Sequence, residues 1–368
     1  MKNISPRAKN FLWALFAGLA SAASSAWAAS VDWQTDWDKT LAAAKKEGKV
    51  VVAGPPGQQF RNALSAFRKS YPEIQVDYVG IQGRDFTPRI MQERRADQYL
   101  WDVHVGGASS MFVSLLPNGV LDPLRPSVTL PEVLLDKNWK GGFDDGWMDL
   151  EKKYIYGFPN YLIHGVQINR DFVPETEFGK ADNLWDPKWK GKITWHDPRG
   201  EGSGANQALM ILIHFGEQAL KRLFRDQEII LTQDYRQQAE WLVRGRYPIG
   251  LGVLNTVLWT LQNEGLGKNV RPLKDLRLIS ATPGFGNAAL INRAPHKNAA
   301  KIYINWLLSR EGQSSYAEHT GDNSRRLDLP PVNAETATEP GVKYLNTMKQ
   351  DHIETRRKAG QIAKEIFK

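Results

Sequence analysis

Four short stretches of the sequence combine glycine with serine, asparagine or proline beside apolar segments: 54–57, 106–110, 201–206 and 284–287. Glycine lets a backbone N–H come close to a ligand, and serine or asparagine adds a side-chain hydrogen bond. That chemistry is the reversible binding of a small polar molecule. The candidate binding residues in these stretches are Gly57, Gly107, Ser109, Ser110, Ser203, Gly204, Asn206, Phe285 and Asn287.

Each stretch taken alone is explained equally well as an ordinary turn between a strand and a helix. Ser203 can cap a helix N-terminus without any ligand. The binding interpretation is favoured because two stretches fall in each half of the chain, where they can face one cleft.

Motifs that would indicate catalysis or metal binding are missing from the sequence. No G-x-S-x-G motif occurs, the seven histidines show no H-x-x-x-H pair, and there is no cysteine. Residues 284–289 match G-x-G-x-x-A literally, but no well-formed helix opens there and no ribose-binding acid follows. We therefore predict no catalytic residue, no metal site and no cofactor.

The first half of the chain alternates predicted strands and helices. Buried strands are expected at 49–53, 75–79 and 101–105, with helices at 33–47, after Gly57 and at 85–99. Such alternation predicts a parallel sheet with right-handed crossovers. Ligands of these sheets bind at the carboxyl ends of the strands, beside helix N-termini.

The second half begins with an extended stretch at 154–169 and then repeats the alternation. We expect strands at 192–195, 249–253 and 276–281, and helices at 203–215, 233–244, 296–310 and in the charged tail after 340. A chain of 368 residues is too long for one typical core and fits two lobes. The predicted boundaries are 29–160 plus 285–368 for lobe 1, and 161–284 for lobe 2.

The N-terminus has the layout of a secretory signal peptide over residues 1–28. Lys2, Arg7 and Lys9 precede an apolar stretch of about ten residues, and Ala26-Trp27-Ala28 is an A-x-A cleavage site. A membrane anchor is the alternative, but a spanning helix needs roughly 20 apolar residues. The sequence thus predicts export to the periplasm and a soluble mature protein.

The composition excludes some classes of partner. Without the three basic leader residues the chain keeps 45 basic and 40 acidic residues, a net charge of +5, which mildly favours an anionic ligand. No basic run with interleaved aromatic residues occurs, so we expect no nucleic acid partner. We expect a monomer.

Three segments resemble those of a known family. Residues 186–193 (DPKWKGKI), 297–301 (KNAAK) and 305–313 (NWLLSREGQ) are similar to extracellular solute-binding proteins of ABC importers, in the group that serves ferric iron, thiamine, phosphonates and sugar phosphates. Asp197-Pro198 followed by Gly202-Ser203-Gly204 also matches. The resemblance implies a two-lobed type 2 periplasmic binding protein fold. It also implies two mainly parallel sheets flanked by helices, two crossovers between lobes, and delivery of solute to a permease and its ATPase.

The resemblance leaves the ligand open. Ferric-binding members carry adjacent tyrosines after the strand that is 249–253 here, whereas this chain has Leu254-Asn255-Thr256-Val257. Asn255 and Thr256 favour hydrogen bonds to a neutral or anionic organic ligand. Arg325 is either a cleft-facing clamp for a carboxylate, phosphate or phosphonate, or an ordinary surface arginine.

Four aromatic residues lie near predicted cleft edges: Tyr161, His164, Trp195 and Phe285. Each either stacks on a ligand or packs in the hinge or core; of these, Tyr161 and Phe285 join the predicted binding residues. The sequence predicts the binding component of an ABC importer for a small anionic organic solute. The alternatives are a ferric-iron or ferric-chelate binder, a secreted enzyme and a sensor-input protein on the same fold.

Overall fold

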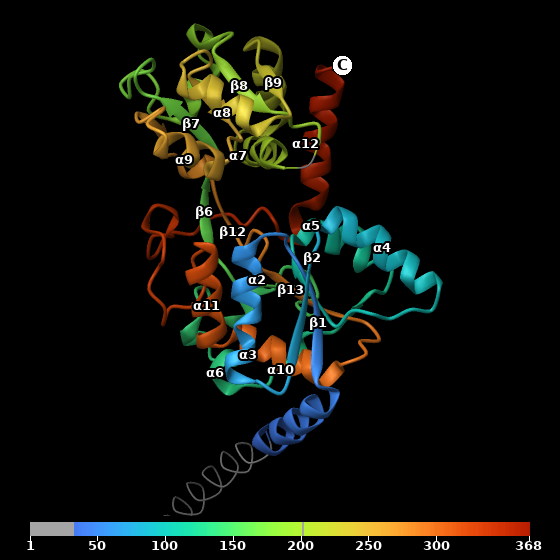
Figure 1. Ribbon diagram of the computed structural model, residues 1–368. Helices are drawn as coiled ribbons and strands as arrows, with labels where there is room; N and C mark the ends of the chain where they lie inside the picture. Colours follow the sequence, from blue (N-terminus) through green and yellow to red (C-terminus); the bar gives the residue numbers. More distant parts are fainter. Residues whose placement is uncertain (1–32, 201) are drawn as a thin grey trace, which may run out of the picture.

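The computed structural model describes residues 33–200 and 202–368, and it places two separate sheets one above the other (Figure 1). The predicted signal peptide, residues 1–28, lies outside the described residues. Residues 33–47 form the first described helix, as the sequence predicts.

The first sheet has the strand order β2-β1-β3-β13-β4, with β5 also paired to β13. One strand, β13, runs antiparallel to the strands beside it, and β1 is parallel to both β2 and β3. The bounds are β1 Lys49–Gly54, β2 Gln75–Gly80, β3 Val103–Gly106, β4 Leu121–Asp122, β5 Tyr156–Gly157 and β13 Asn287–Ile291.

The second sheet has the order β11-β7-β10-β8-β9 and repeats the arrangement of the first. Again one strand, β7, is antiparallel to its neighbours, while β8 is parallel to β9 and β10. In each sheet the reversed strand comes directly after a connecting strand. The bounds are β7 Val166–Asn169, β8 Ile193–His196, β9 Ile230–Thr232, β10 Ile249–Leu251 and β11 Val270–Pro272.

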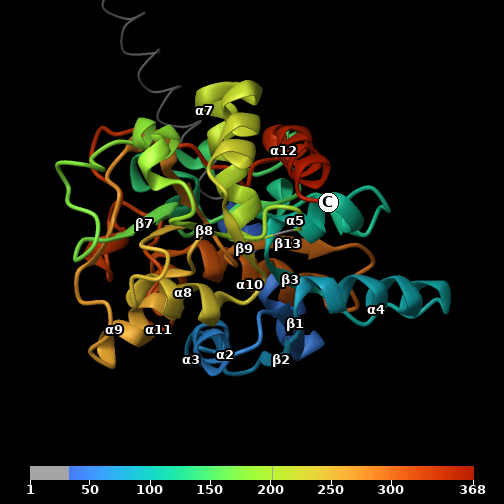
Figure 2. The same ribbon diagram turned by 90° about the horizontal axis from the view of Figure 1, so that it is seen from above.

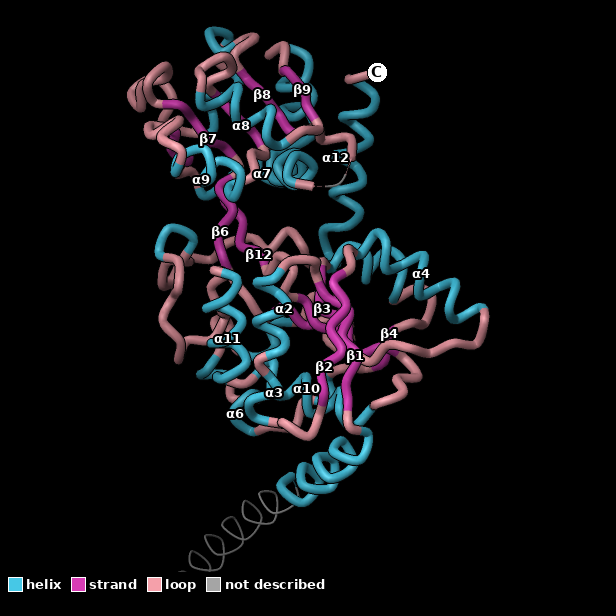
Figure 3. The backbone as a smooth tube through the Cα atoms, in the orientation of Figure 1, coloured by secondary structure: helices cyan, strands magenta, loops and turns pink. Residues whose placement is uncertain are grey.

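A two-stranded antiparallel ribbon joins the two layers (Figure 3). It consists of β6 (Tyr161–His164) and β12 (Ile279–Thr282), with Tyr161 opposite Thr282. We call it the hinge ribbon. The chain enters the second layer through β6 and returns through β12, the two predicted crossovers. The sequence predicts a strand from residue 276, but 276–278 form a 3-10 turn before β12.

Helices flank both sheets. Around the first sheet lie α2 (Gln58–Ser65), α3 (Phe67–Ser70), α4 (Gly83–Arg95), α5 (Ala108–Ser110), α6 (Pro131–Leu134), α10 (Lys297–Leu308) and α11 (Arg310–Thr320). Around the second lie α7 (Ser203–Asp226), α8 (Tyr235–Val243), α9 (Asn255–Asn263) and α12 (Ile353–Ile366). Short 3-10 turns join them at Arg125–Ser127, Asp136–Asn138, Phe143–Gly146, Ala181–Trp185, Pro187–Trp189, Leu276–Leu278, Ala334–Thr336 and Gln350–His352, and Met111–Leu115 is a π-helical turn.

Two helices differ from the sequence expectation for local reasons. The predicted helix 296–310 is two helices, because Ser309 leaves the helical conformation and its side chain caps α11 at the Gly312 N–H. The helix predicted at 203–215 continues to 226 past Gly216, whose φ of 83° marks a kink.

The C-terminal helix α12 makes a third crossing between the layers. The prediction placed 285–368 wholly with lobe 1, but α12 packs beside α7 over the second sheet (Figures 1 and 2). Its Ala359, Ile362 and Ala363 join the hydrophobic core of that layer. The exact lobe boundaries stay a prediction.

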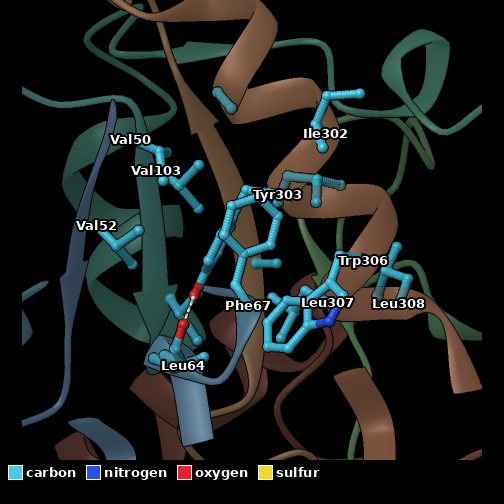
Figure 4. Close-up of a cluster of buried hydrophobic side chains, with 14 of the residues drawn as sticks. Val50, Val52, Leu64, Phe67, Val103, Ile302, Tyr303, Trp306, Leu307 and Leu308 are labelled. Atoms are coloured by element: carbon cyan, nitrogen blue, oxygen red, sulfur yellow. Dashed lines mark hydrogen bonds between the residues drawn. The ribbon is translucent and has the colours of Figure 1, made fainter. Parts of the chain in front are cut away.

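Each layer has its own hydrophobic core, and the tryptophans supply much of it. In the first, Phe67, Tyr303 and Trp306 pack together, and the Tyr303 hydroxyl donates to the Leu64 carbonyl at 3.1 Å (Figure 4). In the second, Trp189 and Trp195 are buried. The high tryptophan content of the chain therefore serves packing more than ligand stacking.

Candidate functional site

The carboxyl ends of the inner strands of both sheets meet the hinge ribbon. β13 starts five residues after β12 ends, and its first residue, Asn287, pairs with Gly106 at the end of β3. In the second sheet, β7 starts two residues after β6 ends, and Val166 pairs with Leu251 at the end of β10. The strand ends of the two sheets thus face each other across the hinge ribbon, where the sequence predicts a ligand.

On the first sheet, this edge carries exposed aromatic surface. The Phe285 side chain is 55% exposed and packs edge-to-face on Phe60 of α2, with ring centroids 6.1 Å apart. Gly107 lies beneath it, since a Cβ added there would sit 3.9 Å from the Phe285 ring. Gly57 precedes α2 with a φ of 131°, which glycine adopts readily.

Beside Phe285, the hinge ribbon and α11 form a corner that contains an acid. The Tyr161 hydroxyl packs against Gly284, where an added Cβ would lie 2.0 Å from it. Asp322 lies two residues after the end of α11, and the Asn160 N–H, next to Tyr161, donates to the carbonyl of the following residue, Asn323, at 2.7 Å. Burial raises the pKa of Asp322 to about 7, because no cation offsets the loss of water around the carboxylate.

On the second sheet, the edge is built by close backbone packing. The Ser203 hydroxyl donates to the Gly252 carbonyl, and the Gly252 N–H donates to the Gly165 carbonyl at 2.9 Å. A Cβ at Gly204 would lie 1.7 Å from the His196 carbonyl oxygen. Ser203 is not the N-cap that the sequence allows, because Gly202 holds that position. These contacts therefore hold the end of β10 against the start of α7.

Tyr235 supplies a hydroxyl beside the start of α7. Its ring stacks on His196 with centroids 3.9 Å apart, and its Oη lies near Gly202. Within the described residues, this hydroxyl donates no hydrogen bond to protein. Burial lowers the pKa of His196, so its imidazole is neutral at pH 7 and adds no positive charge here.

The helices after the inner strands begin without caps. α2, α7 and α9 have no side-chain cap and no acid in the first turn. In contrast, α10 starts at the far edge of the first sheet, where Asp102 and Glu47 accept from its first N–H groups. Free N–H groups and the positive end of the helix dipole attract anions.

The structure commits several other predicted residues to internal contacts. Asn206 in α7 donates to Ser280 of the hinge ribbon at 3.3 Å and accepts from Thr347. Buried Asn287 donates to the carbonyls of Gly106 and Gly284, both at 2.9 Å. Both asparagines therefore hold the loops around the cleft.

Arg325 lies away from this edge. Its side chain is buried, with its guanidinium over the rings of Trp139 and Tyr156 and one N–H donated to the Gly142 carbonyl at 2.9 Å. It is neither a cleft-facing clamp nor a surface arginine, because the aromatic core of the first layer surrounds it. We leave it out of the proposed site.

The remaining predicted residues lie at the edges of the cleft region. Ser109 lines a small cavity of about 50 Å³ with Thr347 and Arg356, and Ser110 donates to the Gly107 carbonyl at 3.3 Å. Asn255 accepts from Gln167 at 3.2 Å, and Thr256 is exposed in the first turn of α9.

Sequence reasoning missed three residues of the site: Phe60, Tyr235 and Asp322. Asp322 lies three residues before Arg325, the residue of this segment that the sequence suggests as a clamp. Among the described residues no group of three or more His, Cys, Asp or Glu side chains could hold a metal ion. No helix in the described ranges is long and apolar enough to cross a membrane.

Comparisons with known proteins agree with this architecture. Residues 49–319 match the family described as bacterial extracellular solute-binding protein. No curated protein matches the chain. Among solved structures, a Trichodesmium protein (IdiA, FutA) in complex with iron and citrate aligns with a TM-score of 0.66 at 17% identity, over 87% of this chain and 99% of that one.

Two further solved structures cover the same 87% of this chain. A Bordetella ferric binding protein aligns with a TM-score of 0.65 at 18% identity, over 99% of its length. PotD from Streptococcus pneumoniae, a spermidine/putrescine transporter binding protein, aligns at 0.61 and 17%, also over 99%. These likenesses establish the type 2 periplasmic binding protein fold, and the family match shows that the chain belongs to the bacterial extracellular solute-binding proteins, which are binding proteins and not enzymes.

Proposed function

We propose that this protein is the substrate-binding component of an ABC importer that captures a small anionic organic solute between its two lobes. The observation that carries the proposal concerns α2, α7 and α9, which begin at facing strand ends of the two sheets. Within the residues that the structure describes, none of the three has a side-chain cap or an acid in its first turn. An anion placed between them accepts hydrogen bonds from both lobes at once.

The contacts at α7 favour an anionic group there. Among the described residues, which leave out Glu201, no side chain accepts from the first N–H groups of α7, and the Tyr235 hydroxyl next to Gly202 adds a donor without a partner. Hydrogen bonds to a charged group contribute about 1.5–3 kcal/mol each. Gly57, Gly107, Ser110, Asn255, Thr256 and Phe285 belong to the proposed site around this anion.

Closure about the hinge ribbon is the proposed mechanism. Each lobe supplies part of the site, so a ligand that bridges them stabilises the closed state over the open one. The permease and its ATPase then select the closed form. The periplasm is the proposed location, because the predicted signal peptide and the extracellular family point the same way.

Ferric iron or a ferric chelate is the second candidate. It is favoured by the likeness of the fold to solved structures of ferric-binding proteins. The absence of tyrosine from 254–257 argues against it, since Leu254 and Asn255 begin α9 there.

A thermal-shift screen tests the proposal. Carboxylates, phosphonates and sugar phosphates are each paired with a neutral amide or ester of the same size. A binder raises Tm in proportion to the logarithm of its concentration, and about 2.7 kcal/mol of stabilisation is expected at 100 times Kd. Shifts with anions alone support the proposal, whereas shifts with neutral compounds or ferric complexes alone contradict it.

A further inference from the structure

Asp322 is a half-buried acid without a counter-ion. Its carboxylate makes no ion pair and no side-chain hydrogen bond with any residue the structure describes, although its own N–H donates to the Thr320 hydroxyl. Burial raises the pKa of this carboxyl. Buried acids are usually paired, and an unpaired one next to the proposed binding cleft is a candidate site for a group that comes from outside the protein.

The groups around Asp322 come from several elements, and none is a cation. Tyr161 of β6 follows Asn160, whose N–H donates to the Asn323 carbonyl at 2.7 Å, and Tyr316 lies in α11, six residues before Asp322. Tyr316 is 2% exposed and its hydroxyl has no hydrogen-bond partner. Burial raises the pKa of both phenols above the usual range, so they stay protonated and act as neutral hydrogen-bond groups near neutral pH.

Aromatic rings extend this corner toward the exposed edge. Tyr316 packs against Phe60 with centroids 6.3 Å apart, and Phe60 packs against the exposed Phe285. Tyr161 touches Gly284, the residue before Phe285. Asp322, Tyr161, Tyr316, Phe60 and Phe285 therefore form one cluster at the hinge end of the first lobe, in which Phe285 is exposed and Tyr316 is buried. We call this cluster the acid–aromatic corner.

We infer that the acid–aromatic corner binds the organic cation of the ligand, an ammonium or substituted ammonium group, so that the solute is a zwitterion. The ring faces attract a cation by its charge, and the carboxylate supplies the opposite charge in a place where water is scarce. This inference rests on the proposed function, which puts the anionic end of the same ligand at the helix N-termini.

The corner favours an organic cation over a bare metal ion. Metal ions take several oxygen ligands at once, and a single carboxylate flanked by protonated phenols is a poor match for one. Apolar ring surface from Phe60 and Phe285 suits the carbon atoms around an ammonium group.

Isothermal titration calorimetry with matched probes tests the inference. The pairs are γ-aminobutyrate with butyrate, 3-aminopropylphosphonate with propylphosphonate, and phosphoethanolamine with ethyl phosphate, which differ by one ammonium group. We expect at least one pair in which the ammonium compound binds the wild type about 10-fold or more tightly than its partner.

The Asp322→Asn variant separates charge from shape. It should reduce that ratio to about one while changing the Kd of the ammonium-free partner by less than about threefold. Glu73→Gln, an exposed acid paired with Lys45, is the control and should leave the ratio unchanged. An unchanged ratio in Asp322→Asn overturns the inference, and circular dichroism confirms that the variant is folded.

The aromatic contribution has its own matched pair. Phe285→Leu should weaken the ammonium compound more than its partner, whereas Phe172→Leu should affect neither. Phe172 is 57% exposed, like Phe285, but it lies past the far end of β7. Equal losses for both compounds in Phe285→Leu would show plain apolar contact and contradict a cation subsite.

Two outcomes distinguish failure of this inference from failure of the proposed function. Tetramethylammonium or putrescine that binds the wild type and not Asp322→Asn, with no anion binding at all, supports the corner and overturns the anionic solute. An iron charge-transfer band that disappears in Asp322→Asn overturns the organic cation in favour of ferric iron.

Discussion

The two lobes share one sheet topology and differ in the surface they turn toward each other. In the first sheet β1 lies between β2 and β3, and in the second sheet β8 lies between β9 and β10. The reversed strands, β13 and β7, each follow directly after a strand of the hinge ribbon. The second lobe meets the cleft with tightly packed backbone at Gly204 and Gly252, whereas the first presents exposed Phe285 and unpaired Asp322. A symmetric scaffold thus carries an asymmetric site, which suits a ligand with two different ends.

The largest expected effect compares one glycine from each lobe. In Gly204→Ala the new methyl group would lie 1.7 Å from the His196 carbonyl, so backbone must move. We expect a loss of about 2–3 kcal/mol in the free energy of unfolding, which exceeds the helix gain of roughly 1 kcal/mol from alanine.

Gly107→Ala is the first-lobe counterpart. Its methyl group would meet the Phe285 ring at 3.9 Å, an ordinary contact. We expect less than about 0.5 kcal/mol of change, measured by urea unfolding of both variants. Equal losses would show that the two edges are packed alike and would remove the contrast between the lobes.

The next effect concerns anion binding at the second lobe. Tyr235→Phe keeps the stack on His196 and removes only the hydroxyl near Gly202. We expect the Kd of an anionic ligand to rise about 10-fold, since a hydrogen bond to a charged group is lost. Tyr247→Phe, whose ring packs on Trp241, is the control. The same Kd in the wild type, Tyr235→Phe and Tyr247→Phe would exclude Tyr235 from the site.

A smaller effect is the pH dependence of stability without ligand. The folded pKa of Asp322, about 7, lies above its usual 3.8, so the native state holds this proton more tightly. That contribution to stability is complete below pH 4 and is lost as the pH rises through 7. The stability of wild type minus that of Asp322→Asn should therefore fall from pH 4 to pH 7.

The stability of wild type is compared with that of Asp322→Asn because His104 also titrates in this pH range. His104 is buried in the first lobe, and burial lowers its pKa from 6.5 to about 4. Its contribution has the opposite sign, since the unfolded state binds the proton and stability is lost as the pH falls from 6.5 to 4. His104 titrates in both proteins, so it cancels. A flat difference curve would mean that Asp322 is not shielded from water.

The smallest effect concerns the helix that joins the lobes. Lys358 of α12 pairs with Glu217 of α7 at 2.7 Å, but the Lys358 side chain is 56% exposed. Lys358→Met should change the free energy of unfolding by less than about 0.5 kcal/mol, because exposed ion pairs contribute little. A loss above 1 kcal/mol in thermal unfolding would show that charge, rather than Ala359 and Ile362, attaches α12.

The sequence predicts the architecture better than the site. Period and strand alternation locate β1, β3, β8 and β10, because buried strands and amphipathic helices leave local patterns. The glycines near the cleft can also be located from the sequence, because they follow the predicted strands directly. The sequence does not show the structural role of each glycine, since Gly57 provides a turn whereas Gly204 allows close contact with His196.

Side-chain partners depend on residues far apart in the chain, which no local pattern reveals. Arg325 is buried over Trp139 and Tyr156, about 180 residues away in the chain. Asn287 donates a side-chain hydrogen bond to the Gly106 carbonyl. Asp322 cannot be singled out from the sequence either, because the lack of an ion-pair partner becomes visible only in the folded structure. From its sequence, the C-terminal helix is a charged tail. In the structure its Ala359 and Ile362 pack in the hydrophobic core of the second layer.

The most direct test of the central claim is the thermal-shift screen with size-matched anionic and neutral organic compounds. We expect at least one anionic compound to raise Tm in proportion to the logarithm of its concentration, while its neutral partner has no effect. A shift given equally by the neutral partner, or by ferric complexes alone, would contradict the claim that the lobes close on an organic anion.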